Sequence, residues 1–194
     1  MPKSFFWAFT HVGEQSCWIP LSWLSYMLDI TFFGVSPGPM HIHNAVLHAL
    51  NASLVFVLLW MVLERGTRYK LKVTGSEPSA SSGSSGSKCN LMAALLAALF
   101  WSWHPLRAES VAWVASRKDV LSFFWELLAL IFWVRGLTGK NLAGLISACC
   151  FGLALLAKPT AMTFPVLAGL LEYAILGTVQ WRRYCGILFL AAVG

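Results

Sequence analysis

Residues 104–121, HPLRAESVAWVASRKDVL, concentrate ionisable side chains in a chain where charged residues make up only 11% of the total. Arg117 and Lys118 are suited to hold a phosphate group, because Arg offers paired hydrogen bonds and Lys a point charge. Glu109 and Asp119 are acids that could orient those bases, bind a metal or move a proton. The alternative is an interfacial helix whose charges are simply solvated, with a Glu–Arg pair that contributes little.

Other polar groups stand in apolar surroundings. Lys158, in LLAKPTAMTFP, is a candidate for a second phosphate contact, with snorkelling to water as the alternative. Asp29 is a candidate base for an acceptor hydroxyl. His41, His43 and His48 stand two, five and seven positions apart, never at the i, i+4 spacing that suits two metal ligands on one helix. We therefore predict hydrogen bonds between helices for these histidines, and no metal site.

The composition is that of an integral membrane protein. Hydrophobic residues make up 58% of the chain and the mean hydropathy is +0.68. A soluble domain would carry about 25% charged residues. Ten Trp and thirteen Phe are typical of a protein anchored at membrane interfaces. The net charge of +6 fits basic cytoplasmic loops, and no basic patch on a soluble domain indicates nucleic-acid binding.

The apolar runs predict an all-α fold, a polytopic membrane helical bundle of five to six transmembrane helices. Residues 1–40 are expected to form an outer-face loop with an interfacial helix in 18–33. Residues 41–63 form the first span, 64–89 a flexible cytoplasmic Ser/Gly loop, and 90–194 the remaining spans. The later spans are expected at 90–104, 119–135, 141–157 and 160–177, with a sixth that begins near residue 184.

The distribution of Lys and Arg predicts the orientation. The segments 64–89, 135–140 and 181–183 carry five, two and two of these residues and are expected to face the cytoplasm. Residues 104–121 then face the outside. An outside N-terminal segment requires an earlier helix to deliver it, so we expect the chain to be a truncated fragment.

Four blocks carry a family resemblance. They are WIPLSWLSYMLDITFFG (18–34), HIHNAVLHALNA (41–52), HPLRAESVAWVASRKDVLSFFW (from 104) and LLAKPTAMTFPVLAGLLEY (155–173). Together they resemble the membrane module of large bacterial proteins that end in tetratricopeptide (TPR) repeats. Those proteins are similar to the eukaryotic transmembrane and tetratricopeptide-repeat O-mannosyltransferases. The resemblance covers nearly the whole chain except the Ser/Gly loop.

The resemblance implies a type-C glycosyltransferase fold in a bacterial inner (plasma) membrane, with its site on the periplasmic face. Such an enzyme transfers a mannose-like sugar from a polyprenyl-phosphate carrier to a hydroxyl of an acceptor protein. The resemblance implies no cofactor, and a divalent metal stays an open alternative. The residues expected at the carrier phosphate are Arg117, Lys118, Lys158 and His104. The candidate catalytic acids are Glu109, Asp119 and Asp29.

Two departures from the family qualify this expectation. The paired-acid motif expected after the first helix would lie upstream of Met1, and the repeat domain is absent. We therefore expect this fragment to lack its catalytic acid and to be inactive alone. The rival class is a non-catalytic membrane scaffold or a transporter subunit. A transporter should show paired, Gly/Pro-interrupted half-helices in repeated halves, and no such repeat is visible.

Overall fold

The computed structural model describes residues 2–10, 18–75, 80–137 and 141–179, and these ranges contain helices joined by turns, with no strand. The coarse prediction of an all-helical fold is thus confirmed for the described part of the chain. The helices are α1 (Pro2–Thr10), α2 (Pro20–Phe33), α3 (Pro37–Thr74), α4 (Ala80–Trp103), α5 (Leu106–Ala112), η1 (Val114–Ser116), α6 (Arg117–Gly136), α7 (Asn141–Ala157), η2 (Pro159–Thr163) and α8 (Phe164–Leu176).

Two of the described helical segments are long and apolar enough to cross a membrane: α3, and Pro159–Leu176, which joins η2 to α8. The pair α4–α5 also qualifies if its bend of 64° is counted within one span. These segments support an integral membrane protein with two or three candidate spans. The predicted count of five to six is not confirmed, and the sixth predicted span lies outside the described residues.

The structure differs from the expected Ser/Gly loop at 64–89. Helix α3 continues to Thr74, and α4 already begins at Ala80. Residues 64–74 are rich in Glu, Arg, Lys and Leu, which are good helix formers, and Arg68 pairs with Glu64 one turn earlier at 3.5 Å. The Ser/Gly tract suggested a loop for the whole of 64–89, but the charged residues that precede the tract are compatible with a helix that extends beyond the apolar run.

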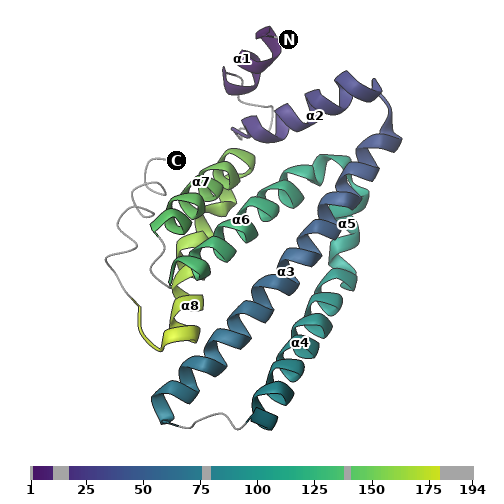
Figure 1. Cartoon of the computed structure of the whole chain (residues 1–194). Coiled ribbons are helices and arrows are strands. Elements are labelled where there is room, and N and C mark those ends of the chain that lie inside the picture. Colours follow the sequence, from purple (N-terminus) through teal and green to yellow (C-terminus); the bar gives the residue numbers. More distant parts are fainter. Residues whose placement is uncertain (1, 11–17, 76–79, 138–140, 180–194) are drawn as a thin grey trace.

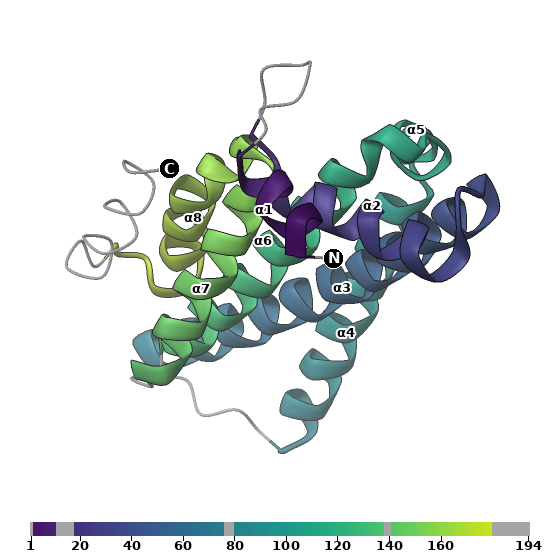
Figure 2. The same cartoon turned by 90° about the horizontal axis from the view of Figure 1, so that it is seen from above.

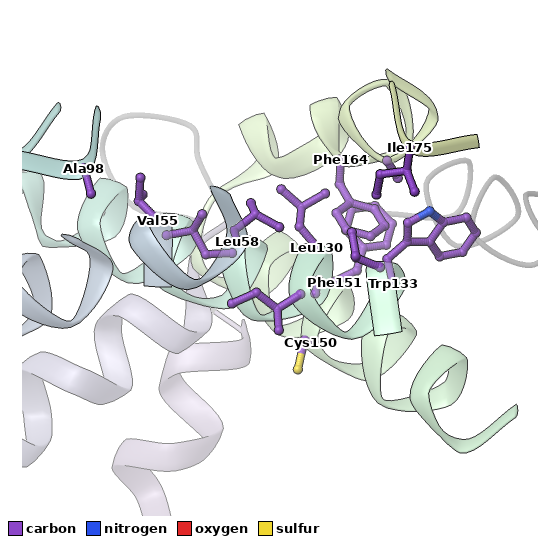
Figure 3. Close-up of a cluster of buried hydrophobic side chains, with 14 residues drawn as sticks. Val55, Leu58, Ala98, Leu130, Trp133, Cys150, Phe151, Phe164 and Ile175 are labelled. Atoms are coloured by element: carbon purple, nitrogen blue, oxygen red, sulfur yellow. The ribbon is translucent and has the colours of Figure 1, made fainter. Parts of the chain in front are cut away.

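Helix α6 is the centre of the bundle. Seen from above, it lies between α7 and α3 (Figure 2), and it packs most extensively on α7. Figure 3 shows the core that these helices share with α8, including Leu58, Leu130 and Trp133. The rings of Phe151 and Phe164 are fully buried and stack with centroids 4.7 Å apart. This core fixes where α6 begins relative to its neighbours.

Helix α2 lies across one end of the bundle (Figure 1). It leads into α3 through Gly34, whose φ of 69° lies in the left-handed region that favours glycine. Helix α3 then starts with Pro37 in its first turn, where the missing N–H costs nothing. This tight reversal brings the polar residues of α2 next to the first turns of α3.

Candidate functional site at one end of the bundle

Polar side chains from α2, α3, α6 and the junction of α7 and η2 gather at one end of the bundle, the end that α2 lies across (Figure 1). We call this cluster the polar end. It consists of Tyr26, Asp29, His43, Asn44, Arg117, Asp119 and Lys158. The residues predicted for the outer face in α2, α3, α6 and before η2 thus lie together. Which side of a membrane this end faces stays a prediction.

Arg117 is completely buried, with 0% of its surface exposed. Its Nη1 donates to Asp29 Oδ2 at 2.5 Å and to the Ser25 carbonyl at 3.4 Å. Its Nε donates to Asn44 Oδ1 at 2.9 Å and its Nη2 to the Met40 carbonyl at 3.0 Å. A buried charge is tolerated only when it is paired and hydrogen-bonded in this way. Every nitrogen of the guanidinium therefore has an acceptor within the protein, and Arg117 ties α2, α3 and α6 together.

The chain breaks its helix just before Arg117, and side chains from other helices hold the break open. Trp113 is extended, with φ −91° and ψ 115°. Its carbonyl accepts from Asn44 Nδ2 at 3.3 Å, and the Val114 carbonyl accepts from the Tyr26 hydroxyl at 2.7 Å. The Tyr26 ring also lies 4.6 Å from the Arg117 guanidinium carbon, a cation–π contact. Backbone carbonyls that lose their helical partner at such a break and are shielded from solvent need another hydrogen-bond donor.

Glu109, Trp113 and Arg117 are spaced by four and would share one face of a continuous helix, but this segment is not one continuous helix. Helix α5 ends at Ala112, η1 intervenes, and α6 begins at Arg117. Glu109 is exposed, whereas Arg117 pairs with Asp29 of α2 instead. The hydrogen bonds from Tyr26 and Asn44 that break the helix come from distant segments, so the i, i+4 spacing contained no sign of them.

Asp29 is buried between two basic partners. Its Oδ2 accepts from Arg117, and its Oδ1 lies 2.9 Å from Nδ1 of His43. The residue is only 5% exposed. Both carboxylate oxygens are thus occupied and shielded from solvent. This geometry suits Asp29 for holding Arg117 in place better than for meeting an acceptor hydroxyl.

His43, His48, Asn44 and Asn51 of α3 make hydrogen bonds to other helices, as predicted, whereas His41 is exposed. His43 reaches Asp29, and Nε2 of His48 lies 3.3 Å from the Ser102 carbonyl of α4. Asn51 Nδ2 donates to the Val120 carbonyl of α6 at 2.9 Å. Across the described ranges, no three His, Cys, Asp or Glu side chains come together as a group that could hold a metal ion.

Asp119 and Lys158 form an ion pair that solvent can reach. Lys158 Nζ donates to Asp119 Oδ1, linking the first turn of α6 to the junction of α7 and η2. The Asp119 side chain is 37% exposed and the Lys158 side chain 29%. An acid beside a base at an accessible position can accept a proton and bind an anion. Among the predicted site residues, this pair is the one best placed to meet a ligand.

The remaining predicted residues lie apart from this pair. His104 is exposed, its Nδ1 accepts from the Leu106 amide at 3.4 Å, and its ring contacts Phe100 at 6.2 Å. Within the described residues, neither His104 nor Glu109 makes a hydrogen bond or ion pair with the polar end. Lys118 is half-buried next to Arg117 in the sequence.

Sequence reasoning missed two side chains, Tyr26 and Arg107. Tyr26 braces Arg117 as described above. The Arg107 guanidinium lies over the Trp101 ring, 4.5 Å from its centroid. Trp101 and Arg107 stand on opposite sides of the break at His104, so helical spacing does not reveal their contact. An aromatic residue within one or two turns of an Arg across such a break is the available signal.

Burial raises the pKa of Tyr26 above its ordinary value of 10.0, and the positive charge of Arg117 partly offsets this shift. Helix α2 is outside the candidate membrane spans. Because the pKa of Tyr26 is higher in the folded than in the unfolded state, the protonated phenol stabilises the fold below about pH 10. This contribution is lost as the pH rises through the folded-state pKa. We expect Tyr26→Phe to remove from the phenolate absorbance curve a titration that lies above the ordinary pKa of tyrosine. Its unfolding free energy should also fall less above about pH 10 than that of the wild type. An unchanged late titration would contradict this.

The chain was compared with known proteins. It is 29% identical over 161 residues to Protein O-mannosyl-transferase Tmtc1 of Drosophila melanogaster, covering 82% of this chain and 16% of that protein. It is 31% identical over 160 residues to Protein O-mannosyl-transferase Tmtc3 of the same organism, covering 79% of this chain and 17% of that protein. It is 23% identical over 192 residues to Protein O-mannosyl-transferase tmtc2 of Xenopus laevis, covering 95% of this chain and 20% of that protein. This chain is similar to protein O-mannosyl-transferases.

The similarity to named O-mannosyl-transferases supports the family resemblance that the four sequence blocks predicted. The chain spans about a fifth of the length of these relatives or less. No protein-family model and no solved structure matches it. The bacterial source and the TPR repeats stay predictions.

Proposed function

We propose that this chain is part of a membrane glycosyltransferase that transfers a mannose-like sugar from a polyprenyl-phosphate carrier to a protein hydroxyl. The observation that carries the proposal is the similarity to named protein O-mannosyl-transferases, one of which matches over 95% of this chain. Such a transfer needs a base for the acceptor hydroxyl and a cation for the departing lipid phosphate. The polar end contains both kinds of group.

In this proposal the Asp119–Lys158 pair meets the substrates. Lys158 neutralises the carrier phosphate, and Asp119 holds Lys158 in place or receives a proton from the acceptor. Lys118, His104 and Glu109 remain candidates for further contacts with the carrier or the acceptor. Arg117 acts one layer below by fixing Asp29. Direct phosphate binding by Arg117, the original prediction, would require its internal hydrogen bonds to open.

Binding of the donor tests the proposed function. The full chain is purified and placed in nanodiscs of neutral phosphatidylcholine, and mannosyl-phosphoryl-polyprenol, polyprenyl phosphate and uncharged polyprenol are titrated. Binding is followed by the fluorescence of the ten tryptophans. We expect saturable binding of both phosphate-bearing lipids and none of polyprenol. Equal responses to all three lipids would refute the proposal.

Lys158→Gln should weaken binding of polyprenyl phosphate by about tenfold, because a charge-assisted hydrogen bond to the phosphate is lost at a partly exposed site. Lys158→Arg should retain most of the affinity. Lys72→Gln is the matched control, since Lys72 is exposed and lies in the last turn of α3, at the opposite end from Pro37. An equal loss in the Lys158 and Lys72 variants would show a general charge effect and contradict the role of Lys158.

A further inference from the structure

Arg107 is held over a stack of rings from three helices. The ring of Trp101 in α4 stacks on His48 of α3 at 5.6 Å and on Phe123 of α6 at 5.3 Å between centroids. The interplanar angles are 22° and 21°. The Arg107 guanidinium carbon lies 4.5 Å from the Trp101 centroid and 5.9 Å from that of Phe123. We call His48, Trp101 and Phe123 the aromatic stack. Contact with ring faces positions a guanidinium without using its N–H donors.

The guanidinium of Arg107 has no hydrogen-bond acceptor and no carboxylate partner among the residues that the structure describes. This contrasts with Arg117, whose nitrogens are all satisfied. Arg107 is half-buried, so it is not a freely solvated surface residue. A positioned guanidinium with open donors matches the geometry of a phosphate group, which accepts paired hydrogen bonds.

The surroundings of Arg107 are those of a lipid headgroup region. Helices α4 and α5 meet at a bend of 64°, which follows the apolar run of α4. Two large apolar side chains beside the bend are exposed, Trp103 by 89% and Leu106 by 75%, and Trp113 at the far end of α5 is 61% exposed. Exposed Trp at the end of an apolar span is typical of the membrane–water interface. Arg107 would thus lie at the depth of lipid phosphates.

Arg107 and the accessible ion pair of the polar end border the same helix, α6. Phe123, beneath Arg107, follows Asp119 by four residues on α6. Residues at this spacing are neighbours on one helix face, with a rise of about 6 Å between them. Asp119 in turn holds Lys158. Two cations, one from α5 and one from the junction of α7 and η2, therefore border the same stretch of α6.

We propose that Arg107, positioned by the aromatic stack, binds the phosphate of a membrane lipid, and that this lipid is the polyprenyl-phosphate carrier. Naming the carrier rests on the proposed function, whereas the phosphate chemistry follows from the guanidinium and its position. Arg107 thus supplies the planar contact to the phosphate and Lys158 the point charge. Arg107 is in this view a substrate-binding residue that acts beside the Asp119–Lys158 pair.

The test uses the full chain in phosphatidylcholine nanodiscs, with polyprenyl phosphate and phosphatidylglycerol as separate probes. Arg107→Gln should weaken binding of polyprenyl phosphate by about tenfold or more, because both the charge and the paired donors are lost. Arg107→Lys should recover only part of the affinity. Arg68→Gln, an exposed Arg on α3 paired only with Glu64 within the described residues, should bind as the wild type does. Far-ultraviolet circular dichroism confirms that each variant is folded.

The possible outcomes separate this inference from the proposed function. If the wild type binds polyprenyl phosphate and Arg107→Gln binds it equally well, the role of Arg107 is overturned and the proposed function stays intact. An equal loss for phosphatidylglycerol and polyprenyl phosphate would overturn the assignment to the carrier. Failure of the wild type to bind polyprenyl phosphate, with phosphatidylglycerol bound through Arg107, would overturn the proposed function and the carrier assignment together. A loss confined to polyprenyl phosphate supports the proposal.

Discussion

Replacing Arg117 with Ala is expected to lower the free energy of unfolding by about 3 to 5 kcal/mol, because removing one partner of a buried ion pair leaves the other charge unpaired. Asp29 is only 5% exposed and would keep only His43 as a partner among the described residues. Asn44 and the Met40 carbonyl would each lose the donor they accept from. Unfolding by denaturant in detergent micelles, followed by circular dichroism, measures the change.

A double-mutant cycle shows whether this loss comes from the pair itself. The double variant Arg117→Ala, Asp29→Ala should be less destabilised than the sum of the two single variants, because no unpaired charge is left behind. Arg117→Lys keeps the charge but not the forked donors, so it should fall between the wild type and Arg117→Ala. Strictly additive effects would contradict a coupled pair. If Arg117→Ala also loses binding of the mannosyl-phosphoryl-polyprenol, that loss reflects disrupted assembly of the polar end and not a lost contact between Arg117 and the phosphate.

Phe164→Ala is expected to lower the free energy of unfolding by about 3 to 5 kcal/mol, since it opens a cavity in a close-packed core. Phe164 is fully buried and stacks on Phe151 at 4.7 Å. It begins α8 directly after η2, whose first residue follows Lys158. The same substitution should therefore also loosen the Lys158–Asp119 pair and weaken binding of polyprenyl phosphate.

Phe100→Ala is the matched control for Phe164→Ala. Phe100 is 76% exposed on α4, and truncating a side chain away from the core changes stability by about 0.5 kcal/mol or less. The two variants are compared by the same denaturant unfolding measurement. Equal destabilisation of both would mean that the Phe151–Phe164 stack does not form the core of the bundle.

Much of the helix content follows from local sequence. The apolar run at 119–135 predicted a helix, and α6 spans Arg117–Gly136. Proline disfavours the helical conformation in the residue before it, and α4 ends at Trp103, directly before His104 and Pro105. Helix ends were less predictable where charged residues continue a helix. Helix α3 reaches Thr74 because its charged residues are also good helix formers.

The candidate site was predictable in its residue types but not in its pairs. Arg117, Asp119, Lys158 and Asp29 all stood out as charged groups in an apolar chain. Their roles differ because Arg117 is buried whereas Asp119 and Lys158 are partly exposed. Burial depends on which helices cover a residue. Arg107 escaped prediction for the same reason, since its ring contacts come from α4 and α6.

The sequence by itself determined that this protein is a membrane helical protein, which residues carry charge, and where proline breaks a span. These properties depend on hydropathy and on local backbone sterics, which act over a few residues. Only the tertiary structure decided that Arg117 pairs with Asp29, 88 positions away, and Lys158 with Asp119, 39 positions away. Hydrogen-bond partners between helices depend on how the helices pack, because spacing along the chain identifies neighbours only within one helix.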